Sequence, residues 1–325
     1  MAFINETLSS MADFATKLDA FAVANGWTQD EFNAGTGRFA LSKSTVFVSF
    51  RWDTASPNSL AIYNALAWSA ATDPGNHTDD SGNGNVSGSE ATLVAGRKLA
   101  ISDTPVQWWG FEDDNYLHFV VQRLDGIHIH GGFGIIDKIG DWTGGEYAYG
   151  YKHKTGVTTN VAVSPESSVL LDGLSAFANI EDFVATMHIE GLQGMPGTTK
   201  WGVCVGQHSA FGTDRASNAR SKIVGGFRGG PVMVPFGRFG QDTSKGLQPM
   251  VPILNWFVDT PVTGDTHPLG WMKDTRLFNG EFWTAGALIT VGGDTWQVFP
   301  SLTKGSSGAL LNTSGHQFVA YKRVA

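Results

Sequence analysis

Short apolar segments alternate with glycine and proline over most of this chain. Glycine accounts for 41 of the 325 residues, about 13% against roughly 7% in an average protein. Segments of this length suit β-strands, and the glycines between them suit tight turns and close contacts between backbones. The chain is therefore expected to fold mainly as short antiparallel strands joined by turns. Examples are VTTNVAVS, DFVATMHIEG, KWGVCVGQ, PVMVPFG and MVPILNWFV.

Local turn signals give the clearest strand predictions. RFALSKSTVFVSFRW, residues 38–52, predicts a hairpin or paired strands. YLHFVVQRL and IHIHGGFGI flank Asp125-Gly126, a dipeptide typical of a type I′ hairpin turn. Near the C-terminal end, ALITVGGDTWQVFPSL predicts a hairpin that turns at Gly292-Gly293, and HQFVAYKRV predicts a final strand.

Two segments carry apolar residues at helical spacing. Residues 5–25 have such a stripe, with Asn5 as N-cap and Gly26 at the usual stop position. Residues 56–70 have Pro57 at the first helical position. We therefore predict an α+β chain, with an N-terminal amphipathic helix, a second helix near 56–70 and a sandwich- or barrel-like set of short antiparallel strands.

A change in composition near residue 155 suggests two domains. Residues 1–155 combine helical and strand patterns, whereas residues 156–325 consist of short strands flanked by glycine. The chain is long enough for two ordinary domains. The expectation is an N-terminal α+β domain followed by a β-rich, glycine-rich domain.

Three histidines, His118, His128 and His130, lie on the hairpin predicted around residues 125–126. A two-residue turn would pair Arg123 with His128. Because side chains alternate between the two faces of a strand, this register places His118 on the opposite face from the other two. The three are then not expected to share a metal ion, and two histidines beside an arginine make a poor cation site.

A second candidate metal site is DDSGNGNVSGSE, residues 79–90, which nearly fits the twelve-residue calcium loop. Asp79 takes its first position, Gly84 its sixth and Glu90 its twelfth. An EF-hand needs a helix that runs into the loop, and Pro74-Gly75 is expected to end the preceding helix before the loop begins. The spacing allows calcium coordination, but a polar loop explains the same residues, so no metal or other cofactor is predicted.

Motifs for nucleophilic catalysis are absent from the sequence: there is no GxSxG elbow, HExxH or P-loop. The single cysteine, Cys204, lies in WGVCVGQ, which alternates like a strand with a buried thiol. Glu112, Asp113 and Asp114 are adjacent and are not expected to converge on one bond, as paired catalytic carboxylates do. A non-enzymatic protein is expected. The sequence contains no stretch of 18 apolar residues, so no membrane-spanning helix is predicted.

Charge is distributed unevenly along the chain. Residues 1–120 hold 6 Lys or Arg and 14 Asp or Glu, whereas residues 198–250 hold 7 and 2. This asymmetry fits a nucleic-acid face, a contact with an acidic protein, or self-association of unlike surfaces. The basic residues are separated by Gly, Phe and Pro and form no compact run, which argues against direct DNA binding. The low charged fraction, 16%, favours a surface hidden in an assembly.

The segment GDWTGGEYAYG, together with SFRWDTASPNSLAIYNALAW, VGGDTWQVFP and QFVAYKRV, resembles a family of virion structural proteins of tailed bacteriophages, encoded among head-to-tail and tail genes. The likeness touches both ends and the middle of the chain and is weakest over residues 156–250. It implies a non-enzymatic component of the virion, in a homo-oligomeric ring of the neck or collar, whose partners are its own copies and other phage virion proteins. The alternative is a baseplate or tail-fibre component whose aromatic residues bind host-surface carbohydrate.

The glycine- and aromatic-rich segment 132–151 is expected to form a docking loop or a tightly packed turn. Glycines allow close approach of backbones, and aromatic rings supply rigid contact area. The acidic N-terminal part and the basic segment 198–250 would supply complementary surfaces between neighbouring copies. The interface candidates are Trp142, Gly144, Gly145, Tyr147, Tyr149, Arg228 and Arg238.

Overall fold

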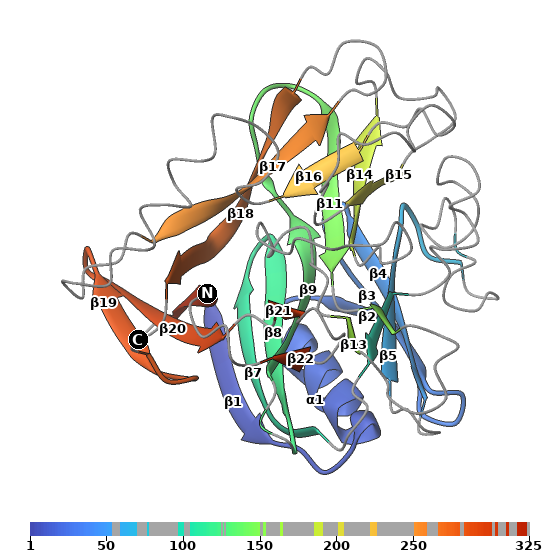
Figure 1. Ribbon diagram of the computed structural model, residues 1–325. Helices are drawn as coiled ribbons and strands as arrows, with labels where there is room; N and C mark the ends of the chain where they lie inside the picture. Colours follow the sequence, from blue (N-terminus) through green and yellow to red (C-terminus); the bar gives the residue numbers. More distant parts are fainter. Residues whose placement is uncertain are drawn as a thin grey trace.

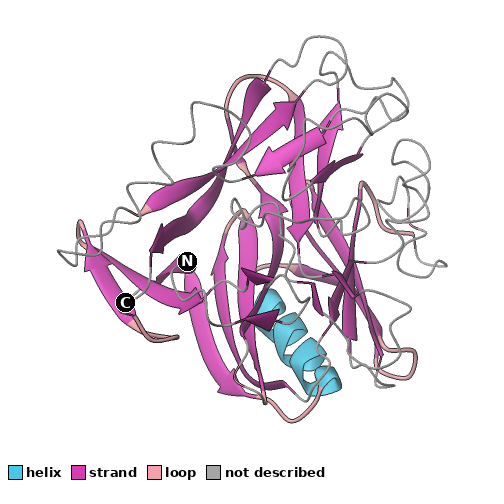
Figure 2. Cartoon of the chain, viewed as in Figure 1, coloured by secondary structure: helices cyan, strands magenta, loops and turns pink. Residues whose placement is uncertain are grey.

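Most of the residues that the structure describes lie in β-strands, as the computed structural model in Figures 1 and 2 shows. This confirms the β-rich character expected from the sequence. The structure describes residues 1–53, 59–69, 77, 97–100, 105–124, 126, 128–149, 152–153, 163–164, 185–190, 201–204, 222–225, 250–258, 266–279, 283–300, 303–304, 310–311 and 317–323.

The larger sheet has 14 strands, drawn from nearly the whole length of the chain. Its neighbouring strands run antiparallel, except for the parallel pair β15 and β16. Strand β10 (Asp137–Lys138) pairs with β18 beside the main path. Strands from both sides of residue 155 thus share one sheet. In spatial order the other strands are β1 (Ala2–Thr7), β7 (Pro105–Asp113), β8 (Tyr116–Arg123), β9 (His128–Ile135), β11 (Thr143–Tyr149), β14 (Ala185–Glu190), β15 (Trp201–Cys204), β16 (Lys222–Gly225), β17 (Val251–Val258), β18 (Thr266–Asn279), β23 (Gln317–Arg323), β20 (Asp294–Pro300) and β19 (Leu288–Val291).

Three smaller sheets complete the described structure. One has five antiparallel strands: β2 (Thr28–Asn33), β3 (Arg38–Lys43), β4 (Val46–Asp53), β5 (Ser59–Ala65) and β6 (Arg97–Ala100). The other two are two-stranded pairs, formed by β12 (Lys152–His153) with β13 (Val163–Ser164) and by β21 (Thr303–Lys304) with β22 (Leu310–Leu311).

The paired strands predicted for residues 38–52 are confirmed as β3 and β4. The second helix predicted near 56–70 is wrong, because residues 59–65 form β5 between β4 and β6. Leu60, Ile62 and Asn64 are buried on one face of this strand. The period of two over a short apolar run, together with pairing on both sides, outweighs the helical reading.

The N-terminal helix forms, but α1 (Met11–Ala24) is shorter than the predicted segment. The first residues of that segment belong to β1, so Ser10 rather than Asn5 is the N-cap. Its hydroxyl accepts a hydrogen bond from the backbone N–H of Asp13 at 3.0 Å. Gly26 follows the helix with φ of +86°, as the stop position requires. No helix in the described part of the chain is long and apolar enough to cross a membrane.

Strands β7, β8, β9 and β11 are covered on both faces. One face packs against α1 and the five-stranded sheet, in a cluster that includes Phe14, Phe50 and Phe119. Figure 1 shows α1 between these four strands and the five-stranded sheet. The other face packs against β18, β20 and β23, and the rings of Phe111 and Tyr321 stack there with centroids 4.9 Å apart. The last strands of the large sheet therefore return to its first strands.

The β8–β9 hairpin forms as predicted, but its register differs by one residue. Gln122, rather than Arg123, pairs with His128. Because a slip of one residue turns every side chain to the other face, His118 shares a face with His128 and His130, contrary to the prediction. The rings of His118 and His130 both contact the same tyrosine ring. The turn explains the error: the N–H of Gly126 donates to the carbonyl of Arg123 at 2.9 Å, so Gly126 ends the β-turn instead of lying at its centre, and the pairing shifts by one residue.

The C-terminal elements match their predictions. Strands β19 and β20 form a hairpin whose two-residue turn is Gly292-Gly293, with φ of +62° and +89°. These positive angles are those of a type I′ turn, which favours glycine at both positions. The predicted final strand is confirmed as β23, which pairs with both β18 and β20.

Candidate functional site

The segment that carries most of the predicted interface residues is strand β11, in the interior of the large sheet, and is neither a docking loop nor a turn. Its register with β14 shifts between Gly144 and Tyr147, which marks a β-bulge. Gly144 and Gly145 have φ of +116° and +108°. A Cβ atom on Gly144 would lie 2.1 Å from the carbonyl oxygen of His188. Only glycine therefore fits the backbone at the first position of this bulge.

Tyr147 and Tyr149 are fully buried within the chain and present no exposed surface. Both rings lie on the face of β11 that packs against β18, β20 and β23. Tyr149 and His118 pair with Gly132 from opposite sides, and Tyr147 pairs with Gly134. The two glycines leave room for rings from both neighbouring strands: a Cβ atom on Gly132 would lie 2.8 Å from Nδ1 of His118 and from Cε1 of Tyr149.

Hydrogen bonds join these rings into a histidine–tyrosine network. Nδ1 of His118 lies 2.9 Å from the hydroxyl of Tyr149, and its Nε2 lies 3.4 Å from that of Tyr147. Nδ1 of His130 lies 2.8 Å from the hydroxyl of Tyr321. Burial lowers the pKa of His118 to about 3 and that of His130 to about 4, and it raises the pKa of Tyr147. The imidazoles and this phenol are therefore uncharged near neutral pH.

The network connects strands that lie far apart in the sequence. His118 and His130 belong to β8 and β9, Tyr147 and Tyr149 to β11, and Tyr321 to β23. A buried network whose members have partners rigidifies a core and specifies one arrangement of its strands. The one-residue register slip explains why the sequence did not predict it. The signal that could have found it is the period-two spacing of polar aromatic residues in the two neighbouring strands.

A charged cluster lies on the opposite face of β11. The carboxylate of Glu146 is 2.8 Å from Nδ1 of His188, and that of Glu190 is 3.0 Å from its Nε2. Burial alone would lower the pKa of His188, but hydrogen bonds to the two carboxylates raise it above its ordinary value. Burial would raise the pKa of Glu146, but hydrogen bonds from His188 and Thr45 lower it. The cluster thus joins β11 to β14 and to the turn after β3, and sequence analysis did not identify it.

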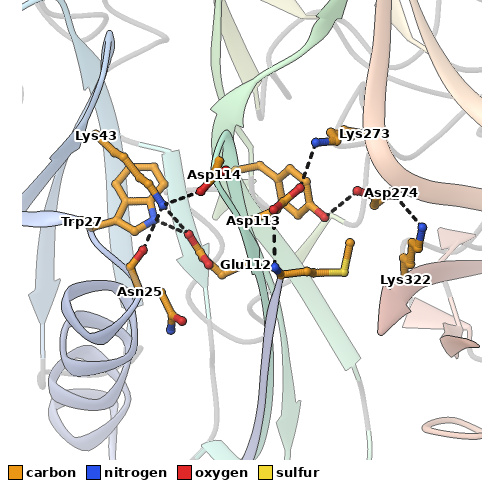
Figure 3. Close-up of polar contacts among 11 residues, drawn as sticks. Asn25, Trp27, Lys43, Glu112, Asp113, Asp114, Lys273, Asp274 and Lys322 are labelled. Atoms are coloured by element: carbon orange, nitrogen blue, oxygen red, sulfur yellow. Dashed lines mark hydrogen bonds and ion pairs between the residues drawn. The ribbon is translucent and has the colours of Figure 1, made fainter. Parts of the chain in front are cut away.

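Ion pairs at the turn between β7 and β8 connect this hairpin to the five-stranded sheet on one side and to β18 on the other (Figure 3). The carboxylate of Glu112 accepts a hydrogen bond from Nζ of Lys43 on β3 at 2.8 Å. Asp113 points the other way, and its carboxylate lies 2.8 Å from Nζ of Lys273 on β18. Glu112 and Asp113 thus bind different layers, whereas the carboxylate of Asp114 lies 3.8 Å from Nζ of Lys43, the same group that Glu112 binds. The other labelled members of this network are Asn25, Trp27, Asp274 and Lys322.

Three apolar side chains that are at least partly exposed lie near the junction of β10, β18 and the start of β11. We call them the tryptophan patch: Ile139, Trp142 and Trp271. Ile139 is 36% and Trp271 37% exposed, and Trp142 is partly buried. The indole N–H of Trp271 donates to the carboxylate of Asp137 at 3.1 Å, and that of Trp142 donates to the carbonyl of Leu269 at 3.3 Å. Trp142 is therefore the aromatic interface candidate that the structure keeps near the surface, and its ring is held in place.

Other predicted positions lie elsewhere. Arg228, Arg238 and the loop Asp79–Glu90 are outside the described residues. Cys204 ends β15, which confirms the strand predicted around it. Within the described residues, no group of three or more His, Cys, Asp or Glu side chains is placed to hold a metal ion.

Comparison with known proteins supplies no family: no protein-family model matches the chain, and no curated protein matches it.

Proposed function

We propose that the protein is a non-enzymatic structural subunit of a tailed-bacteriophage virion, assembled as a homo-oligomeric ring of the neck or collar at the head–tail junction. The resemblance of four sequence segments to phage virion proteins points to this class. The structural observation that carries the proposal is the tryptophan patch.

The tryptophan patch has the properties of an assembly contact. Aromatic residues are preferred anchors of protein interfaces, because one ring buries a large area at a small cost in side-chain entropy. The hydrogen bonds from Trp142 and Trp271 to the chain itself hold both rings before any partner arrives. Neighbouring Asp137 and Lys138 place both signs of charge beside the rings, as at the rim of an interface.

The interior supports the same proposal. The histidine–tyrosine network and the ion pairs of Figure 3 lock the strands into a rigid body. Such a body presents its contact surfaces in fixed positions.

The test uses phage particles that carry Trp271→Ala. We expect this substitution to lower the yield of complete particles by about tenfold or more, since anchor residues cost about 2 kcal/mol or more when truncated. Leu124→Ala is the matched control, because Leu124 is 69% exposed and lies outside the patch. Normal yield with Trp271→Ala would contradict the role of the patch. Gold labelling of the chain at the head–tail junction of intact virions would support the proposed position in the neck. Absence of the chain from intact virions would overturn the proposal.

The alternative is a baseplate or tail-fibre component that binds host-surface carbohydrate. One observation favours it: the exposed ring of Trp271 lies beside the carboxylate of Asp137, and sugars stack on such rings while acidic groups accept their hydroxyl hydrogens. Binding of host glycans by the purified chain, lost in Trp271→Ala, together with labelling at the tail tip, would favour this alternative over the neck.

A further inference from the structure

Strand β19, at one end of the large sheet, has an edge that pairs with no strand in the described part of the chain. It is the last strand in the sheet order, and among the described residues it pairs only with β20. Figure 1 shows the β19–β20 hairpin at the left margin of the molecule. Leu288 and Val291, at its two ends, are 49% and 48% exposed. Natural proteins protect such edges with charged residues, proline or a bulge, and Leu288–Val291 contains no charge and no proline.

From this edge we infer that β19 pairs antiparallel with β19 of a second copy of the chain, about a two-fold axis at Thr290. The large sheet then continues from one copy into the next. This inference stands on β19 alone and does not depend on the proposed place in a virion.

The turn determines which backbone groups face outward. Val291 and Asp294 flank the two-residue turn and therefore form a hydrogen-bonded pair. Hydrogen-bonding direction alternates along a strand, so the N–H and C=O groups of Ile289 and Val291 point to β20. Those of Leu288 and Thr290 point to the open edge.

The side chains then select a register. A two-fold axis perpendicular to the sheet pairs only residues that share a face. Centred on Thr290, the register lets Thr290 exchange two backbone hydrogen bonds with its own copy. Ile289 then faces Val291 of the second copy, twice, at non-hydrogen-bonded positions where side chains approach most closely. Two apolar β-branched pairs form, and both exposed Val291 side chains are covered.

The same register extends an existing core. Ile289 packs against the cluster that contains Phe278, Trp296, Val298 and Phe318. Because Val291 lies on the same face as Ile289, the pairing would join this cluster to its counterpart in the second copy. The contact would therefore bury a continuous apolar layer as well as complete a row of backbone hydrogen bonds.

The chemistry of β19 favours a second copy over a different protein. Near a two-fold axis each residue meets its own copy or a close neighbour, so a charge in the strand would face a like charge. All of the positions from Leu288 to Val291 are uncharged. Thr290, at the axis, tolerates its own copy because cross-strand threonine pairs are favourable.

The test measures the mass of the purified full-length chain in solution as a function of concentration. We expect dimers, or assemblies with an even number of chains. Thr290→Pro removes the outward N–H but leaves the bonds to β20 intact, and Thr290→Lys places two ammonium groups across the axis. Each is expected to raise the dissociation constant of the dimer by about tenfold or more, which is about 1.4 kcal/mol. Leu124→Lys adds the same charge at an exposed site elsewhere and should leave the dimer unchanged.

Two results would overturn the inference. One is a chain that stays monomeric at every concentration, and the other is a dimer that Thr290→Pro and Thr290→Lys leave intact. Circular dichroism and a melting curve establish that each variant is folded. Thr290→Cys with a short thiol-to-thiol cross-linker tests the register: it should give a covalent dimer, whereas the unaltered chain, with Cys204 alone, should not. A Thr290→Cys dimer that fails to cross-link would refute the pairing about Thr290.

Discussion

Nδ1 of His118 lies 2.9 Å from the hydroxyl of Tyr149, across a strand that separates the two residues in the sheet. The contact is possible because the residue between them, Gly132, has no side chain. Its Cα is paired with both neighbours, so their rings lie over the glycine and meet above it. The histidine–tyrosine network therefore depends on an atom that is absent as much as on the groups that are present.

We expect Gly132→Ala to disrupt this contact. The added Cβ would lie 2.8 Å from Nδ1 of His118 and from the carbonyl oxygen of Leu117, and the backbone oxygen has little freedom to move. The free energy of unfolding, measured by chemical denaturation, should fall by about 3 kcal/mol or more. Gly140→Ala is the control: no atom lies within 4 Å of its Cβ, and its φ of +82° costs only about 1–2 kcal/mol. Equal losses for the two variants would contradict the steric argument.

Tyr149→Phe is predicted to cost about 1–3 kcal/mol of unfolding free energy, because it removes a hydroxyl and leaves Nδ1 of a buried imidazole without this partner. Tyr321→Phe should behave in the same way through His130. Leu124→Ala, at an exposed position, should change the free energy of unfolding by less than about 0.5 kcal/mol. A Tyr149→Phe chain as stable as the original would mean that the hydroxyl contributes nothing.

Mild acid should destabilise the fold. Burial lowers the pKa of His118 to about 3 and the pKa values of His128 and His130 to about 4. Between the unfolded pKa, about 6.5, and these values, the unfolded chain binds more protons than the folded one, so stability falls as the pH decreases. Each histidine contributes a slope approaching 1.4 kcal/mol per pH unit below pH 6.

Unfolding curves at pH 6.5, 6 and 5 measure this slope before the carboxylates titrate. His128→Gln should reduce this slope by about one quarter to one third, since it removes one of the four described histidines whose pKa burial lowers, the fourth being His77. A slope that is the same in the original chain and in His128→Gln would exclude His128 as a source of the acid sensitivity.

The cluster around His188 should respond to pH in the opposite direction. Its pKa is raised by Glu146 and Glu190 against the effect of burial, so its stabilising contribution is complete below about pH 6.5 and is lost as the pH rises through the folded value. Glu146→Gln should lower the pKa of His188, because burial then acts with less opposition. The measurement is an NMR titration of the His188 imidazole.

Glu190→Gln is the matched variant for that titration. The Glu190 side chain is more exposed than that of Glu146, and water screens its charge, so the pKa of His188 should fall less. An unchanged pKa of His188 in Glu146→Gln would contradict the assigned pair.

Local turn chemistry made part of the fold predictable. Gly292-Gly293 requires positive φ angles and fixes the closing hairpin within a few residues, and Gly26 marks the end of α1 for a similar reason. The signal is local in both cases, because it depends on the backbone freedom of one or two residues. Tertiary partners were not needed to read it.

Long-range pairing decided the rest. Residues 59–65 have an apolar spacing that allows helix or strand, and only β4 and β6 on either side determine the choice. The β8–β9 register differs by one residue from the prediction because Gly126 ends the β-turn that starts at Arg123, instead of lying at the centre of a two-residue turn. This shift of one residue in the predicted register placed His118 on the wrong face, so the histidine–tyrosine network was not predicted.

The candidate site divides along the same line. The sequences around Trp142 and Tyr147 are similarly rich in glycine and aromatic residues, but Trp142 lies near the surface and Tyr147 is completely buried. Aromatic residues anchor cores and interfaces alike, so their presence does not tell which surface they cover. Trp271, which shares the patch with Trp142, is distant from it in the sequence. No local sequence pattern indicates that the two residues lie near each other.

Strands β7, β8, β9 and β11 form a wall common to two cores: α1 and the five-stranded sheet pack on one side of it, and β18, β20 and β23 pack on the other. The helical layer and the layer of late strands are consequently expected to melt together, in one cooperative transition, with no half that survives the loss of the other. Damage to this shared wall reaches both sides of the molecule at once.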